Sequence, residues 1–157
     1  MNTEIDALRS EHSHLLEKIN DLAQRESGSS KIFKELRELS YLHVEREQET
    51  IIPLLRYLKL RLDGKTEKYP PNLLELRNRM ILRYGALIED HVHIMNLLEE
   101  AFHETYQVEV TEFVKNIAHH IALEEQVLYP AAMAAVDLIL TDGKIKKTVR
   151  ESPATLF

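Results

Sequence analysis

The chain has 157 residues, a length typical of one domain. Its net charge of −6 argues against general binding to nucleic acid or to an anionic membrane, since both require a basic face. Cys is absent, which excludes disulfides, thiolate catalysis, Cys-ligated zinc and iron–sulfur clusters. No apolar run approaches the ~20 residues that a membrane span requires, and the first residues are polar and acidic, unlike a signal peptide. We therefore expect a cytoplasmic protein with neither nucleic acid nor membrane as partner.

Apolar residues recur at helical spacing in the first half of the chain. The apolar seam of the first predicted helix consists of Ile5, Leu8, His12, Leu15, Ile19 and Leu22. The run Ser27–Ser30 ends this helix, and a second helix extends from Ser30 to about Leu60. Its seam consists of Leu36, Ser40, His43, Glu47, Ile51 and Leu54. The segment Asp63–Asn72 is rich in turn-forming and charged residues, so it predicts the central connection.

The second half of the chain repeats this pattern. A third helix is predicted from Leu73 to Glu104, and a fourth begins after a connection near Tyr106. The third seam consists of Tyr84, Ile88, His91, Met95, Leu98 and Phe102. The fourth seam consists of Phe113, Ile117, His120, Glu124, Val127 and Ala131. Because strand-like alternation is absent, the fold class is all-α, and four helices with short connections predict an up-down-up-down bundle.

Turn residues and prolines set the expected limits of the helices. Thr141–Gly143 is a stop signal, so residues 1–140 are expected to form the bundle and residues 141–157 a short polar C-terminal tail. Pro53 and Pro130 lack a backbone N–H, and they therefore predict a kink or an end in the second and fourth helices.

Two motifs occur twice in the chain. His43–Pro53 and His120–Pro130 both have Glu four residues after His, then two apolar residues and Pro. Glu11–His14 and Asp90–His93 both read acid-His-x-His. The chain is therefore predicted to consist of two similar helix-pair halves, which suggests a pseudo-symmetric site where the halves meet.

Six ionisable residues occupy seam positions that would otherwise hold Leu or Ile. They are His12, His43, Glu47, His91, His120 and Glu124. Residues four apart on a helix project from one face, and burial of so many ionisable groups is costly unless they are paired or bound to a metal. A nitrogen and oxygen ligand set without sulfur suits iron or manganese, with zinc as a further option. The alternative is that these residues are hydrogen-bonded core or surface pairs.

Other chemically active side chains have simpler interpretations. The remaining histidines are expected at the surface or at a helix terminus: His14, His93, His103 and His119. Glu45 and Glu125 are expected in solvent, with contact to a ligating imidazole as a second interpretation for Glu125. Tyr84 and Tyr129 are expected in the core and not as redox groups.

In combination, these motifs resemble the hemerythrin-like (HHE cation-binding) family over about residues 3–135. The resemblance implies a four-helix bundle that holds two non-haem iron ions joined by an oxo or hydroxo bridge, with manganese or zinc as alternatives. It makes the imidazoles terminal ligands: His12, His43, His91 and His120. It makes Glu47 and Glu124 the carboxylates that bridge the two metal ions.

The chain departs from the pattern of the oxygen-carrying hemerythrins. Met95 stands four residues after His91, where those proteins have another His, and the fourth helix has His-x3-Glu in place of His-x4-Asp. One imidazole fewer leaves an open position on each iron, which suits NO capture, peroxide reduction or sensing better than O2 transport.

We therefore expect a non-haem di-iron protein that binds or senses O2, NO or peroxide, or handles iron. One alternative is a di-iron oxidoreductase, such as a peroxidase, a ferroxidase or an NO-handling or iron–sulfur-repair-like enzyme. The other is a metal-free helical interaction module. The expected partner is a small diatomic or peroxide ligand, the chain could form a homodimer, and the sequence identifies no redox partner.

Overall fold

The computed structural model describes residues 2–25, 29–104 and 108–151, with side chains for 5–25, 29–65, 67–104 and 108–142. Its elements are α1 (Asn2–Gln24), α2 (Ser30–Leu62), the 3-10 turn η1 (Thr66–Lys68), α3 (Leu73–Glu104), α4 (Val108–Leu123), the π-helical turn η2 (Glu124–Leu128) and α5 (Tyr129–Glu151). The segments α4, η2 and α5 follow one another without a gap and form one continuous helix. The described residues contain no strand, which confirms the all-α prediction and is consistent with a helical bundle.

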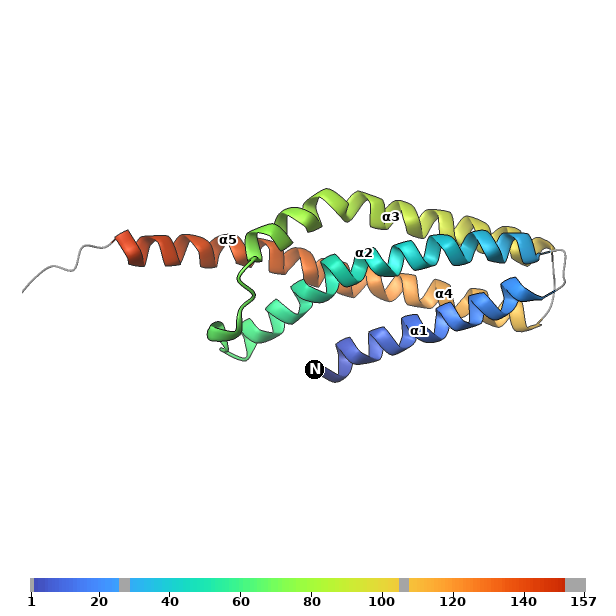
Figure 1. Ribbon diagram of the computed structural model, residues 1–157, viewed down its shortest axis with the longest axis horizontal. Helices are drawn as coiled ribbons and strands as arrows, with labels where there is room; N and C mark the ends of the chain where they lie inside the picture. Colours follow the sequence, from blue (N-terminus) through green and yellow to red (C-terminus); the bar gives the residue numbers. More distant parts are fainter. Residues whose placement is uncertain (1, 26–28, 105–107, 152–157) are drawn as a thin grey trace, which may run out of the picture.

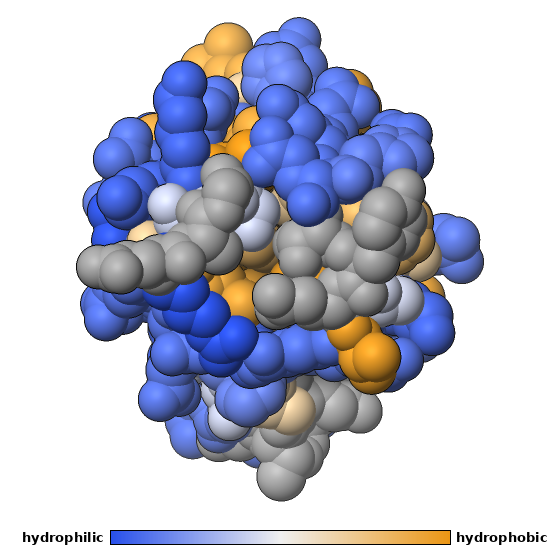
Figure 2. Space-filling view, turned by 90° about the vertical axis from the view of Figure 1, so that its right-hand side faces the viewer, coloured by the Kyte–Doolittle hydropathy of each residue, from blue (hydrophilic) through white to orange (hydrophobic). Residues whose placement is uncertain are grey.

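The long helices lie lengthwise along the molecule (Figure 1). Helix α2 packs against α1, α3 and α5. The segment between α2 and α3 comprises residues 63–72, as predicted, and lies in the left-hand half of Figure 1, where α5 extends beyond it. Figure 2 views the opposite end of the molecule, where hydrophilic residues make up most of the coloured surface. Within the described residues, no helix has both the length and the apolar content needed to cross a membrane.

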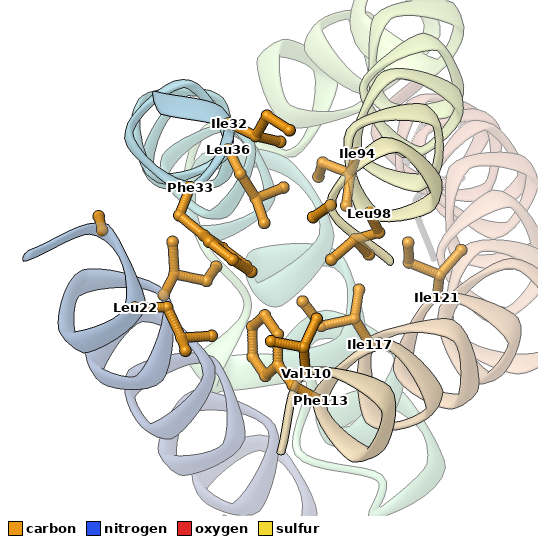
Figure 3. Close-up of a cluster of buried hydrophobic side chains, with 13 residues drawn as sticks. Leu22, Ile32, Phe33, Leu36, Ile94, Leu98, Val110, Phe113, Ile117 and Ile121 are labelled. Carbon is orange, nitrogen blue, oxygen red and sulfur yellow. The ribbon is translucent and has the colours of Figure 1, made fainter. Parts of the chain in front are cut away.

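Buried apolar side chains form two main clusters along the helices. The first joins the C-terminal half of α1, the N-terminal half of α2, the C-terminal half of α3 and α4, and its side chains converge between these helices (Figure 3). The second joins the C-terminal half of α2, the N-terminal half of α3 and α5. A small third cluster consists of Ile5, Leu8 and Ile52. On α1, α2 and α3, the predicted His and Glu positions fall between the first cluster and the other two, and His120 on α4 lies at the end of the first cluster, between Ile117 and Ile121.

Leu36 is fully buried in the first cluster, whereas Leu42 on the same helix is 51% exposed. We predict that Leu36→Ala lowers the free energy of unfolding by about 2–5 kcal/mol, because it removes packed methyl groups and leaves a cavity. The matched change Leu42→Ala should stay within about 0.5 kcal/mol. Urea unfolding followed by circular dichroism measures both, and equal effects would contradict this account of the core.

Tyr84 does not lie in the core, contrary to prediction, because it is 36% exposed. The buried stripe of α3 passes instead through Met80, Leu87, His91 and Ile94. This stripe lies one residue before the predicted positions Ile88 and Met95, which are only partly buried. The predicted seam therefore identified the buried His of α3 but was rotated too far towards the edge of the bundle.

Val127 also leaves the predicted seam and is 52% exposed. The reason is the π-helical turn, whose backbone hydrogen bonds span five residues where those of an α-helix span four. The backbone N–H of Tyr129 donates to the carbonyl of Glu124, a bond across five residues. After this turn the buried positions are Tyr129, Ala132, Ala135, Val136 and Ile139.

Neither proline ends its helix. Helix α2 continues through Pro53, which leaves the carbonyl of Glu49 without its usual helical donor. The guanidinium of Arg79 lies 3.4 Å from this carbonyl and donates to it. Pro130 follows the π-helical turn directly, and α5 continues beyond it.

The predicted stop at Thr141–Gly143 is also wrong, because α5 continues to Glu151. Asp142 is tied to α2 by two bonds: the hydroxyl of Tyr57 donates to it at 2.7 Å and Arg61 at 3.0 Å. These contacts hold this stretch of α5 against α2. The predictions at Ser27 and Gly28, at Tyr106 and at residues 152–157 lie outside the described residues.

Candidate metal centre

The six predicted site residues are all buried, with 1–5% of each exposed. They come from four helices and the π-helical turn: His12 from α1, His43 and Glu47 from α2, His91 from α3, His120 from α4 and Glu124 from η2. Their donor atoms form two groups in which all atoms lie within 4.8 Å of one another. One group consists of His43, Glu47, His91 and Glu124, and the other of His12, His120 and Glu124.

Glu124 is common to both groups. Its Oε1 atom lies 3.0 Å from Nε2 of His12 and 2.8 Å from Nε2 of His120. Its Oε2 atom lies 3.2 Å from Nε2 of His91. Each oxygen therefore faces a different group, which is the arrangement that a carboxylate needs to bridge two cations.

Glu47 lies opposite Glu124 with a less symmetric environment. Its Oε1 atom accepts a hydrogen bond from the hydroxyl of Tyr129 at 2.8 Å. Its Oε2 atom lies 3.2 Å from Nε2 of His12 and 3.7 Å from Nε2 of His43. Neither Oε2 of Glu47 nor Oε2 of Glu124 has a hydrogen-bond partner, although both atoms are buried. Buried polar atoms are nearly always satisfied, so these two oxygens fit ligation of a cation.

The two carboxyl groups differ in acidity. Burial, and then the charge of Glu124, raises the pKa of Glu47 to about 7. Burial also acts to raise the pKa of Glu124, but the close imidazoles of His12, His120 and His91 outweigh it and hold that pKa below the ordinary value. The centre therefore concentrates one firmly ionised carboxylate among four imidazoles.

Three of the four imidazoles turn Nε2 inward and Nδ1 towards a carboxylate outside the group. Nδ1 of His43 lies 3.3 Å from Asp90, and Nδ1 of His120 lies 3.4 Å from Glu11. Asp90 is held in turn by Arg46, whose guanidinium donates to it at 2.6 Å. At His43 and His91 the hydrogen-bonded carboxylate fixes the proton on Nδ1, which leaves the Nε2 lone pair free for a metal. Nδ1 of His120 lies near Glu11 without a hydrogen bond to it.

Glu11 and Asp90 were assigned no role from the sequence, yet the signal was present. They are the acids of the repeated acid-His-x-His motif. Each carboxylate contacts an imidazole on a different helix and not the His that follows it. Helical spacing within one segment could not predict these contacts, because they depend on how the helices pack.

Glu125 supports the second interpretation given to it above. Its side chain is 39% exposed, yet Oε1 lies 2.8 Å from Nδ1 of His91. Burial acts to lower the pKa of His91, but the close carboxylates of Glu124 and Glu125 outweigh it and raise the pKa above the ordinary value. In His43, by contrast, burial dominates and lowers the pKa of the imidazole.

A cavity of about 40 Å³ adjoins the four imidazoles. Its wall is largely apolar and consists of Leu15, Leu16, Ile19, Val44, Ile94, Ile117 and Ile121, with Ser40 and Glu124. One water molecule needs roughly 10–15 Å³ measured in this way, so a diatomic or peroxide-sized ligand has room here. The cavity lies on the side of the centre that faces the first core cluster.

The other expectations for single residues are largely confirmed. The four remaining histidines are exposed, namely His14, His93, His103 and His119. Glu45 is exposed as well. Tyr129 is fully buried, as expected, but its hydroxyl belongs to the centre and not only to the core.

The donor set and its surroundings fit a metal site, because buried imidazoles and carboxylates converge and both Oε2 atoms of the two Glu residues lack a hydrogen-bond partner. A model of the hemerythrin family, described as the hemerythrin HHE cation binding domain, matches residues 3–132. Comparisons with curated proteins and with solved structures give no match. The family match extends over all four helices that carry the converging His and Glu side chains, and the chain therefore belongs to the hemerythrin HHE cation-binding family.

Proposed function

We propose that the protein binds two non-haem iron ions in this centre and uses them to bind or sense O2, NO or peroxide, or to handle iron. The observation that carries the proposal is the convergence of six buried donor residues in two groups that share Glu124. The apolar cavity against the imidazoles supports a small uncharged ligand or peroxide as the partner.

The two groups of donors assign a ligand set to each ion. His43 and His91 with Glu47 and Glu124 would hold one ion, and His12 and His120 with Glu124 the other. Nitrogen and carboxylate donors suit iron, with manganese or zinc as alternatives. An up-down-up-down order of two similar halves would explain why both halves contribute the same residue types.

Ferrous iron would supply the electrons and the open coordination positions for a small ligand. The chain would supply the geometry, since carboxylates hydrogen-bonded to Nδ1 orient the imidazoles of His43 and His91 and the cavity wall is largely apolar. Among the described residues that line the cavity, His12, His43, His91 and His120 are the only imidazoles. Met95, which stands where the oxygen-carrying hemerythrins have a further His, packs against the first core cluster. The lack of this imidazole favours sensing or reaction over O2 carriage.

Metal analysis of matched histidine variants tests the proposal. His12 is buried in the centre and His14, two residues on, is exposed. We predict that the purified protein contains iron or takes it up anaerobically, that His12→Ala loses at least one of the two ions, and that His14→Ala keeps both. Mass spectrometry for metal content and the near-ultraviolet spectrum before and after exposure to air measure these outcomes.

Metal analysis and assays on the same protein separate the remaining alternatives. A protein that neither contains iron nor takes it up would contradict the proposal and favour a metal-free interaction module. Steady-state consumption of peroxide or NO with a reductant would identify an oxidoreductase. Slow oxidation in air without turnover would favour a sensor.

A further inference from the structure

Tyr129 is the residue of the centre that neither the motif nor the donor groups explain. It is fully buried, and its hydroxyl donates to Oε1 of Glu47 at 2.8 Å. The same hydroxyl lies 3.3 Å from Nε2 of His91, and the two rings stack with centroids 5.5 Å apart and planes 10° apart. Tyr129 therefore contacts two members of one donor group.

The π-helical turn places Tyr129 there. In an α-helix the carbonyl of Glu124 would accept from residue 128, and residue 129 would point to a different face. In this chain the carbonyl accepts from Tyr129, so that the extra residue brings the Tyr129 side chain round to the face of the helix that carries Glu124. Such turns cost regular hydrogen bonding and occur often at functional sites.

The first half of the chain has no counterpart to this phenol. In the repeated motif, Ile52 stands where the second half has Tyr129. Ile52 is 1% exposed and packs with Ile5 and Leu8, and α2 is α-helical at this point. The hydroxyl thus breaks the pseudo-symmetry of the two halves on one side of the centre only.

We infer that Tyr129 makes the two metal positions unequal, so that the group His43, Glu47, His91 and Glu124 binds its ion first and more tightly. This inference rests on the proposed metal centre. The group offers four donor residues against three in the other group. Tyr129 also holds Oε1 of Glu47, which fixes the carboxylate with Oε2 turned towards Nε2 of His43 at 3.7 Å and of His12 at 3.2 Å, and a fixed ligand loses less entropy on binding.

Titration of the apo-protein with Co²⁺ alone tests the inference. Calorimetry and the visible spectrum of bound Co²⁺ should show two unequal steps for the wild-type chain. In Tyr129→Phe the first step should weaken by about 10–100-fold, the usual cost of losing a hydrogen bond to a metal ligand, while the second step changes little. Tyr57→Phe is the matched control, since Tyr57 is an equally buried residue and its hydroxyl donates to Asp142, away from the centre.

A spectroscopic signal separates this role from a purely structural one. The chain has six Tyr and no Trp, so tyrosines dominate its near-ultraviolet circular dichroism. The first equivalent of Co²⁺ should change this signal in wild type and Tyr57→Phe but much less in Tyr129→Phe.

Three results of these titrations would contradict the inference. Two equal steps in the wild-type chain, a measurement that needs no variant to fold, would overturn the inference while leaving the metal centre intact. An unchanged first step in a folded Tyr129→Phe protein would do the same. Failure of the wild-type chain to bind Co²⁺ or Fe²⁺ at all would overturn the metal centre itself, and the inference with it.

Discussion

Replacing Glu124 with Gln should abolish tight metal binding at both positions, the largest loss expected from one substitution in the centre. Glu124 is the only residue that belongs to both donor groups, and its two oxygens approach the imidazoles of three helices. Gln has nearly the same volume but lacks the negative charge that a bridging ligand supplies. Metal content after anaerobic loading and dialysis measures the loss.

Glu125 provides the matched control for this prediction. It is the next residue, it is partly exposed, and it reaches only the outward nitrogen of His91. Glu125→Gln should therefore weaken binding by about 10–100-fold at most, without loss of either ion. If Glu124→Gln kept both ions with ordinary affinity, neither group of donors would be the metal site.

The six buried His and Glu residues that converge could be identified from the sequence, because their positions depend on local periodicity. His12, His43 and His120 each fall on an apolar seam, and the spacing of four residues places a Glu beside two of them. The repeated motif then indicates that both halves contribute the same residue types. None of these steps requires knowledge of how the helices pack, and all six residues are buried within reach of one another.

The surroundings of the ligands depend on packing between helices and were predicted less well. Asp90 contacts an imidazole of α2, and Glu11 one of α4, pairs separated by tens of residues in the chain. The sequence predicts Tyr84 in the core because an apolar pattern shifted by one residue along the helix keeps the same helical spacing. A single sequence cannot resolve this rotation when apolar residues occupy neighbouring positions, as Leu87 and Ile88 do.

The π-helical turn explains the other large departure. A seam extrapolated with a constant period must fail after an inserted residue, and Val127 is the first position affected. Pro130 is the sequence feature closest to the cause, since it lacks an amide N–H and its ring crowds the preceding turn. The prediction of a kink or an end at this residue identified the correct place but not the form that the irregularity takes.

Removing the metal should lower the thermal stability of the protein substantially. The centre buries four imidazoles and two carboxyl groups, and buried ionisable groups are costly without compensation. A ligand that binds only the folded state at a thousand times its dissociation constant adds about 4 kcal/mol. For a chain of this size each kcal/mol corresponds to roughly 2–4 °C, so chelation should lower the melting temperature by roughly 8–16 °C.

Two variants show whether this stabilisation comes from the centre. Leu36→Ala should melt at a lower temperature in every condition yet keep the full shift on metal addition, because Leu36 lies in the first apolar cluster. Glu124→Gln should lose the shift, because both donor groups lose their common ligand. Differential scanning calorimetry with Fe²⁺ under anaerobic conditions, with and without chelator, measures all three proteins. An equal shift in Glu124→Gln would show that cations stabilise the chain elsewhere, and the buried His and Glu residues would then need another explanation.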